Sequence, residues 1–404
     1  MRLFRHRPSV GIGVDFGTSS VKVVELVRGR SGFRLVTYAV TRQPNLLLDN
    51  NAPDSVPRAA VLLRAMFQRA HVSHGEVAAA LPVLSVFSTV LELPQMPERE
   101  LSSAVTFMAK NYVPSPLTEV VLGWLTIGPP EDLNRSAPAE SAPVGEGQGS
   151  SSFARLGTGA AAAPRPVAGA PLSPTRSLEI RKIQEVFLTA APRELVGRYT
   201  ALFERLNLRL AALEVESFPL ARSLIRGDRR PILLVDLGDR TTSFSIVERG
   251  YLRLNQAIDV GGEAITNAIA KKLSLPIDQA EQRKRAEGLS SSAEAGAAGT
   301  SDIGSSIAAI LRPLVMEIIT RAEVVRRLYE RKSHRALAAV QLIGGGARLP
   351  QLAAFWTSVT GVPCEVGNPW RGISVPAPLT EHLRRLGPSF SVAVGLALRP
   401  FEES

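Results

Sequence analysis

The chain has 404 residues, a formal net charge of +10 and 45% apolar residues, which together predict a folded protein of two or more domains. Its single cysteine, Cys364, excludes a disulfide framework and a thiolate metal site, and fits a reducing cytoplasm. Aromatic residues make up only 5% and the arginines are dispersed, so we expect no nucleic-acid partner. No uncharged stretch reaches the roughly 20 apolar residues of a membrane-spanning helix.

Residues 9–83 are predicted to begin the first domain. Apolar runs separated by short polar turns predict a meander of three strands, at 10–14, 21–28 and 33–40. Helical spacing predicts a helix at 55–70, and a buried strand is expected at 77–81. The apolar face expected on that helix consists of Val61, Leu62, Ala65 and Met66.

A glycine turn with hydroxyl side chains joins the first two strands and follows an aspartate. Glycine lets the backbone approach a phosphate, and exposed N–H groups and hydroxyls can bind the phosphate oxygens. The aspartate can hold Mg²⁺ through waters. Taken alone, such a turn is most simply an ordinary hairpin. The residues of this first phosphate turn are Asp15, Gly17, Thr18, Ser19, Ser20 and Lys22.

Residues 84–213 are predicted to form an inserted β-α-β-β-α-β module. Strands are expected at 84–93, 119–127, 180–190 and 208–214, and helices at 98–112 and 192–206. A stretch rich in Pro, Gly, Ala and Ser interrupts the module at 128–178. It lacks the apolar groups needed to offset ordering entropy, which predicts a disordered loop; a partner-binding tail is the alternative.

A second turn of the same kind follows a connecting helix in residues 214–230. It lies within a hairpin expected at 232–249 and contains Asp236, Gly238, Thr241 and Thr242. Two such turns facing each other would clamp a nucleoside triphosphate from both sides. The side chains of Asp239 and Arg240, however, could crowd or repel the triphosphate.

The remaining segments predict a further sheet and several helices. A strand at 251–260 is followed by helices at 263–272 and 277–288, a low-complexity stretch, and a long helix at 306–332. A strand at 336–342 then ends in three glycines, which leave bare backbone against which a flat base or ribose can lie. These glycines are Gly344, Gly345 and Gly346.

This order of motifs resembles the actin/Hsp70/hexokinase nucleotide-binding fold. Within that superfamily, the opening residues 11–26 resemble the PilM family, the actin-like proteins of type IV pilus assembly. Residues 93–101 and 112–116 carry the same resemblance, as do residues 258–266 and 395–399. The resemblance covers nearly the whole chain outside about 128–178.

The resemblance implies an α/β, ribonuclease H-like fold of two actin-like domains with an inserted subdomain of the FtsA/PilM type. The first domain would combine 9–83 with 366–404. The second would combine 231–261 with 306–365, and residues 262–305 would form a small subdomain beside the nucleotide.

The resemblance also implies ATP and Mg²⁺ as cofactors. Asp15 and Asp236 are the expected Mg²⁺ ligands. Glu281 and Lys284 match an adenosine-contacting pair, although from sequence alone they are an ordinary exposed helix pair. The other residues implied to bind the nucleotide are Gly17, Thr18, Ser19, Ser20, Lys22, Gly238, Thr241, Thr242, Gly262, Gly344, Gly345, Gly346 and Arg348.

Glu216 stands where relatives carry a carboxylate that orients the attacking water, but a helix-capping role explains it equally well. We therefore expect ATP binding and at most slow turnover.

The implied partner is the N-terminal cytoplasmic tail of a PilN-like inner-membrane protein. The tail would dock in a groove between the first domain and the 84–213 module, next to the helix at 98–112. Such a partner would place the chain at the cytoplasmic side of the inner membrane. Through this tail the chain would link the alignment complex to the pilus motor, with pilus motor ATPases as further candidate partners and homo-oligomerisation left open. The alternatives are an FtsA-like filament protein of cell division and a small-molecule kinase of the same superfamily.

Overall fold

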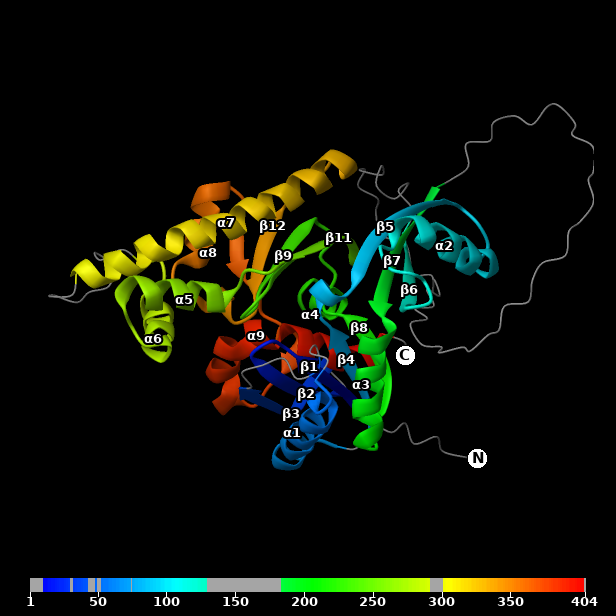
Figure 1. Ribbon diagram of the computed structural model, residues 1–404, viewed down its shortest axis with the longest axis horizontal. Coiled ribbons are helices and arrows are strands. Elements are labelled where there is room, and N and C mark those ends of the chain that lie inside the picture. Colours follow the sequence, from blue (N-terminus) through cyan, green and yellow to red (C-terminus); the bar gives the residue numbers. More distant parts are fainter. Residues whose placement is uncertain are drawn as a thin grey trace, which may run out of the picture.

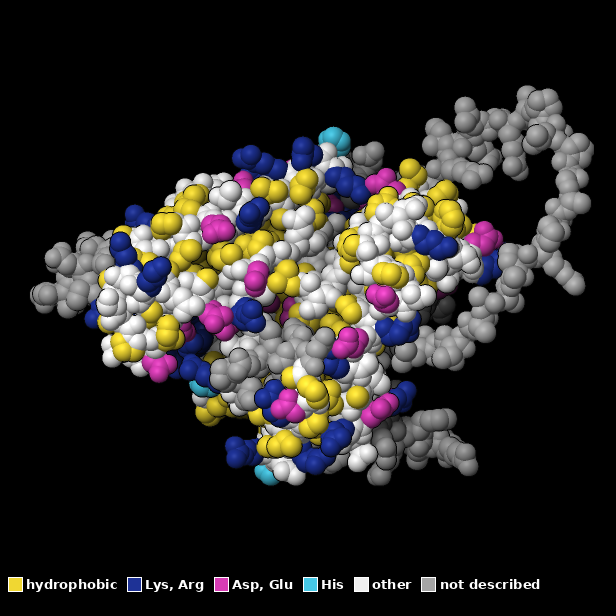
Figure 2. Space-filling view, viewed as in Figure 1, with side chains coloured by type: hydrophobic (Ala, Val, Ile, Leu, Met, Phe, Trp, Pro, Cys, Tyr) yellow, Lys and Arg dark blue, Asp and Glu magenta, His cyan; other side chains and the backbone are white. Residues whose placement is uncertain are grey.

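The computed structural model describes residues 10–29, 32–42, 48, 52–73, 75–128, 183–290 and 301–402, with only the backbone for 301–306. These residues form three parts (Figure 1): a first domain at the bottom of the view, a second domain at the upper left, and a smaller inserted part at the upper right. Figure 2 shows the same view with the side chains coloured by type. The segment expected to be a disordered loop at 128–178 lies outside the described residues, apart from Gly128.

The first domain is built on a six-stranded sheet. Strand β1 pairs with β2 in antiparallel fashion and with β4 in parallel, and β2 pairs with β3, which confirms the meander at the start of the chain. The strands, in sheet order, are β14 (Ile373–Ser374), β3 (Gly32–Arg42), β2 (Ser20–Gly29), β1 (Val10–Phe16), β4 (Glu76–Leu81) and β8 (Arg209–Val215).

Helices cover both faces of this sheet. Because neighbouring strand residues point to opposite faces, Val23 packs against α1 (Ser55–Arg69) and α3 (Arg193–Arg205), and Val24 packs against α9 (Thr380–Leu398). Helix α4 (Ser217–Leu224) also lies on α9, where a Cβ on Gly395 would stand 1.8 Å from the Pro219 carbonyl oxygen. The glycine therefore sets how closely the two helices approach.

The second domain contains a five-stranded sheet. Its strands, in sheet order, are β11 (Tyr251–Ile258), β10 (Thr242–Glu248), β9 (Ile232–Leu237), β12 (Ala339–Ile343) and β13 (Cys364–Val366). Four helices pack with this sheet around one core: α5 (Gly262–Leu273), α6 (Ile277–Glu287), α7 (Ser301–Ser333) and α8 (Leu352–Thr360).

The inserted part is a three-stranded sheet covered by one helix. Strand β7 (Ile183–Pro192) lies between β5 (Phe87–Pro94) and β6 (Val120–Ile127), and α2 (Glu98–Tyr112) packs on one face. The sequence predicted six elements for this module, and the structure divides them between two sheets: β8 joins the first domain, and α3 packs on its core.

The predicted face of α1 needs correction in part. Val61 is 70% exposed, whereas Ala59, Ala60 and Leu63 are buried beside Met66, which was predicted correctly. No described helix is long and apolar enough to cross a membrane.

Candidate functional site

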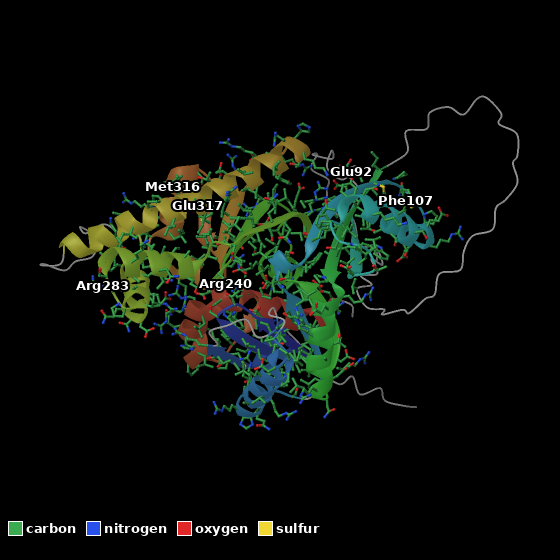
Figure 3. All side chains as sticks on the ribbon, in the orientation of Figure 1. Glu92, Phe107, Arg240, Arg283, Met316 and Glu317 are labelled. Carbon is green, nitrogen blue, oxygen red and sulfur yellow. The ribbon has the colours of Figure 1, made fainter. Side chains whose placement is uncertain are left out.

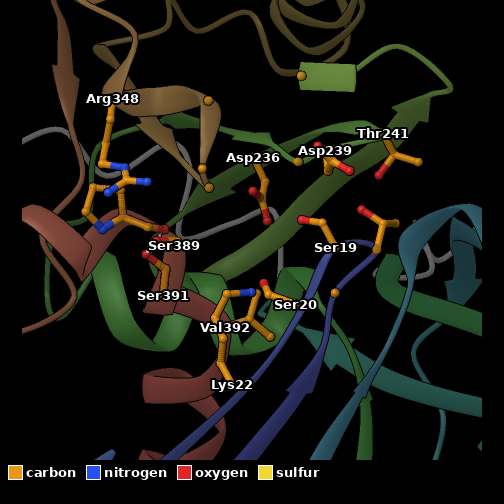
Figure 4. A pocket seen from close by; sticks show the side chains of 18 of the residues that line it. Ser19, Ser20, Lys22, Asp236, Asp239, Thr241, Arg348, Ser389, Ser391 and Val392 are labelled. Carbon is orange, nitrogen blue, oxygen red and sulfur yellow. Dashed lines mark hydrogen bonds between the residues drawn. The ribbon is translucent and has the colours of Figure 1, made fainter. Parts of the chain in front are cut away.

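A cleft of about 320 Å³ lies between the two domains, where the ends of β1 and β9 meet (Figure 4). Residues 17–19, between β1 and β2, form one wall. Residues 238–241, between β9 and β10, form the opposite wall, and the glycines after β12 and the middle of α9 complete the lining. The structure therefore brings together three motifs that are far apart in the sequence.

Each of the two turns is closed by a backbone hydrogen bond between equivalent positions. The Gly17 amide donates to the Ser20 carbonyl at 3.0 Å, and the Gly238 amide donates to the Thr241 carbonyl at 2.9 Å. Within the described part of the chain, the amides of residues 18, 19 and 239–241 have no hydrogen-bond acceptor. Each of the two turns at the cleft therefore carries backbone donors without an acceptor, an arrangement that suits phosphate oxygens.

Lys22, Asp15 and Asp236 form the charged floor of the cleft. Lys22 Nζ donates to Asp15 Oδ2 at 2.9 Å, and both side chains are largely shielded from solvent. Burial, and then the nearby Asp15 carboxylate, raise the pKa of Asp236 to about 6, while Lys22 opposes this shift. Two carboxylates share one ammonium here, so the floor has a surplus of negative charge.

Gly344 is the turn residue that brings β12 against this floor. Its φ is +80°, and a Cβ would stand 2.3 Å from Asp236 Oδ1. Its amide donates to the Pro388 carbonyl of α9 at 2.8 Å. A Cβ on Gly345, in contrast, would meet no heavy atom within 4 Å. Gly344 is therefore required by the backbone, while Gly345 leaves open space.

Lys284 and Glu281 belong to a hydrogen-bonded cluster at the side of the cleft. Lys284 Nζ lies 2.9 Å from the Gly262 carbonyl and 2.7 Å from Thr266 Oγ1, and it forms an ion pair with Glu281. Burial opposes ionisation of Glu281, but hydrogen bonds from Lys284 and Thr266 lower its pKa to about 2. Lys284 thus ties α6 to the start of α5.

Arg348 lines the cleft near Arg285 and Glu281 of α6, within the short helical turn that follows the glycines. Burial, together with the charges of Arg285 and Arg42, lowers the pKa of the Arg348 guanidinium. Three guanidinium groups therefore influence this end of the cleft, and Arg348 and Arg285 both line it.

Glu216 lies at the start of α4, and its side chain makes no capping hydrogen bond with that helix. Its carboxylate instead accepts the Val83 amide at 3.2 Å, and its own amide donates to the Leu81 carbonyl at 3.1 Å. Glu216 therefore connects α4 to the end of β4 while it lines the cleft.

All the residues predicted for this site line the cleft except Thr242. That prediction is wrong, because Thr242 is fully buried and its hydroxyl donates to the Val260 carbonyl at 2.7 Å. Strand alternation places Thr241 and Ser243 in the cleft and Thr242 on the other face, a signal that was available in the sequence. The lining residues that sequence reasoning missed are Ser243, Arg285, Leu349, Pro388, Ser389, Ser391 and Val392.

Among the described residues, no group of three or more His, Cys, Asp or Glu side chains is placed to hold a metal ion. Asp15 and Asp236 are only a pair. The two carboxylates repel each other, and this repulsion contributes to the raised pKa of Asp236. A hydrated divalent cation bound beside them would offset their negative charge.

A family model described as type IV pilus assembly protein PilM matches residues 13–137 and 175–401. The solved structure of a PilM–PilN type IV pilus biogenesis complex superposes with a TM-score of 0.70 at 25% sequence identity, covering 97% of this chain and 98% of that chain. The ethanolamine utilization protein EutJ from Carboxydothermus hydrogenoformans superposes with a TM-score of 0.50 at 15% identity, covering 97% and 90% of the two chains. These findings confirm the predicted actin-like fold.

The chain is also similar, over about half its length, to cell division protein FtsA. The Pseudomonas aeruginosa protein is 27% identical over 210 residues, which is 48% of each chain. The Neisseria meningitidis protein is 25% identical over 209 residues, 48% of this chain and 49% of its own length. The chain thus spans about half the length of these curated relatives.

Proposed function

This chain belongs to the family of type IV pilus assembly protein PilM, and from that premise we propose that it is a nucleotide-binding adaptor. It holds Mg²⁺ and ATP in the cleft and docks the N-terminal cytoplasmic tail of a PilN-like inner-membrane protein. Through that tail it works at the cytoplasmic side of the inner membrane. The observation that carries the nucleotide half is the pair of turns, closed in the same way, that face each other across the cleft.

Each part of the cleft suits a different part of the nucleotide. The free amides of the two turns, with the hydroxyls of Thr18, Ser19 and Thr241, bind phosphate oxygens, and Lys22 adds a positive charge. The bare backbone of Gly345 and the guanidinium of Arg348 bind the nucleoside. Asp15 and Asp236 hold Mg²⁺ through its waters, and the ion neutralises phosphate charge.

We propose binding rather than turnover as the main role of the cleft. Hydrolysis requires a group that orients a water molecule, and Glu216 is the candidate in the cleft wall. Its carboxylate already accepts the Val83 amide, and so it is held by the end of β4. Any hydrolysis would therefore be slow.

A second groove, of about 280 Å³, suits the proposed tail. It lies where the inserted part meets the two domains, and its apolar lining includes Leu125 of β6, Phe218 and Ile225 of the α4 region, and Leu252 of β11. The charged side chains that line it are Glu214, Arg222, Arg226, Arg399 and Glu402. Among the described residues, β6 has a strand partner on one side only. An extended peptide can add to such an edge through its backbone and place alternate side chains in the groove.

The groove lies on the face of the inserted sheet opposite α2. Leu122 and Trp124 of β6 pack with α2, whereas Ile127 packs with the second domain, and strand alternation puts Leu125 on the same face as Ile127. The helix at 98–112, expected from the sequence to adjoin the tail, does not line this groove. Leu125 is therefore the position to test.

A synthetic N-terminal peptide of the cognate PilN-like protein tests the proposal. By calorimetry, the peptide should bind the wild-type chain, and Leu125→Asp should abolish binding while ATP affinity stays unchanged. Phe107→Asp is the matched control, because Phe107 lies on α2 and is 65% exposed (Figure 3). Binding that survives Leu125→Asp but is lost in Phe107→Asp would place the tail on α2 instead.

A further inference from the structure

Asp239 puts a carboxylate at the tip of the second phosphate turn. It lines the cleft between Asp236 and Thr241, across from Ser19 of the first turn (Figure 4). The neighbouring backbone amides are the donors that suit phosphate oxygens. Asp239 is thus an anionic side chain on the wall that would receive an anionic ligand.

The backbone around Asp239 holds it in place. The Glu263 amide donates to the Asp239 carbonyl at 2.7 Å, and the Gly262 amide donates to the Gly238 carbonyl at 3.0 Å. A Cβ on Gly261 would stand 2.5 Å from the Asp239 carbonyl oxygen, so the start of α5 is packed directly behind the turn. The turn cannot move away from a bound phosphate without breaking these contacts.

No basic side chain in the described part of the chain forms an ion pair with Asp239. The adjacent Arg240 lies 3.8 Å from Glu263, and Lys284 is bound to Gly262, Thr266 and Glu281. Burial and the nearby Glu263 raise the pKa of Asp239, although the charges of Lys284 and Arg285 oppose this shift.

We propose that Asp239 is a specificity-determining residue that selects nucleotides by the charge of their phosphate chain and disfavours a triphosphate relative to a diphosphate. The proposal rests on the proposed nucleotide site. Like charges brought together at a binding surface weaken binding, and each added phosphate increases the charge that Asp239 opposes. The chain should therefore bind ADP at least as tightly as ATP.

Calorimetry with ADP and ATP at one fixed Mg²⁺ concentration tests this inference. Asp239→Asn keeps the shape of the side chain and removes its charge, so it should tighten ATP binding about tenfold more than ADP binding, a modest effect for one screened charge. Asp239→Ala should shift the ratio of the two affinities in the same direction. Asp278→Asn, at an exposed position on α6, is the control and should leave the ratio unchanged.

The outcomes separate the two claims. If the wild-type chain binds neither nucleotide, the proposed nucleotide site itself is wrong. If both nucleotides bind but Asp239→Asn leaves their ratio unchanged, the charge-selection proposal is overturned. A ratio that shifts only in Asp239→Ala also overturns it, because bulk rather than charge would then be responsible.

Discussion

At Asp236, stability and the proposed binding of Mg²⁺ oppose each other. Its pKa is raised above the ordinary aspartate value to about 6, so folding favours the protonated form. Stability that is present below about pH 4 is then lost as the pH rises to about 6. Above this range the fold holds an ionised carboxylate that the unfolded chain would solvate better.

We therefore expect Asp236→Asn to raise the melting temperature of the metal-free protein at pH 8 and to change it much less at pH 5. The same substitution should remove any stabilisation by Mg²⁺. Thermal unfolding in a chelating buffer at both pH values measures this. A variant that is less stable than the wild type at pH 8 would show that the carboxylate is not destabilising.

Gly344 and Gly345 are neighbours, but only Gly344 occupies a position that excludes a side chain. Gly344→Ala combines a φ of +80° with a Cβ placed 2.3 Å from Asp236 Oδ1, so it should destabilise the fold by about 2 kcal/mol or more. Gly345 has a φ of −65° and open space around it, so Gly345→Ala should change stability by about 0.5 kcal/mol at most. Equal melting temperatures for the two variants would contradict this assignment.

Glycines in helices give a second matched pair. Gly197 lies within α3, and a Cβ there meets no atom within 4 Å, so Gly197→Ala should stabilise by about 0.5–1 kcal/mol. Gly395 of α9 faces the Pro219 carbonyl at 1.8 Å, so Gly395→Ala should force α4 and α9 apart and destabilise. Denaturant unfolding of both variants should give shifts of opposite sign.

The elements that the sequence predicts well are those defined by local signals. Helix α2 has the predicted bounds, and β1, β9 and β10 follow from apolar runs that end at glycine turns. What could not be predicted depends on packing over long sequence distances. Ser389 and Ser391 reach the cleft only because α9 crosses between the domains, and no local pattern marks that position.

Packing over long sequence distances also decides which elements of the predicted 84–213 module join the first domain. The sequence marks α3 and β8 as a helix and a strand, but not which sheet they join. The parallel pairing of β4 with β8 assigns β8 to the first domain, and burial of Tyr199 and Phe203 near Phe16 assigns α3 there. Both are contacts between residues more than 100 positions apart.

A chain of alternating charges joins the inserted part to the second domain. Arg253 of β11 donates a hydrogen bond to the Glu185 carboxylate of β7 at 2.8 Å. The Arg253 guanidinium also lies 3.6 Å from the carboxylate of the buried Glu248, which forms a second ion pair with Arg335. Lys332 of α7 reaches Glu92 of β5 at 2.8 Å. The inserted part is thus held by ion pairs as well as by apolar packing.

Arg253→Met should destabilise the protein by about 3 kcal/mol, because it leaves Glu185 and Glu248 with fewer partners in a buried setting. The control is Arg384→Met, which removes an exposed pair with Glu381 and should cost about 0.5 kcal/mol or less. Thermal unfolding of the two variants measures the difference. Similar small losses for both would mean that the ion pairs between the two parts contribute little.

We propose that both turns hold one nucleotide at once, and calorimetric titration with Mg²⁺ and ATP measures whether they do. Lys22→Ala changes the strand that follows the first turn, Asp236→Ala changes the strand that precedes the second turn, and Lys271→Ala changes an exposed lysine on α5 outside the cleft. We predict that the first two variants each lose affinity about tenfold or more, while Lys271→Ala binds as the wild type does. If both Lys22→Ala and Asp236→Ala bind ATP with the affinity of the wild type, the two turns do not hold the nucleotide as proposed.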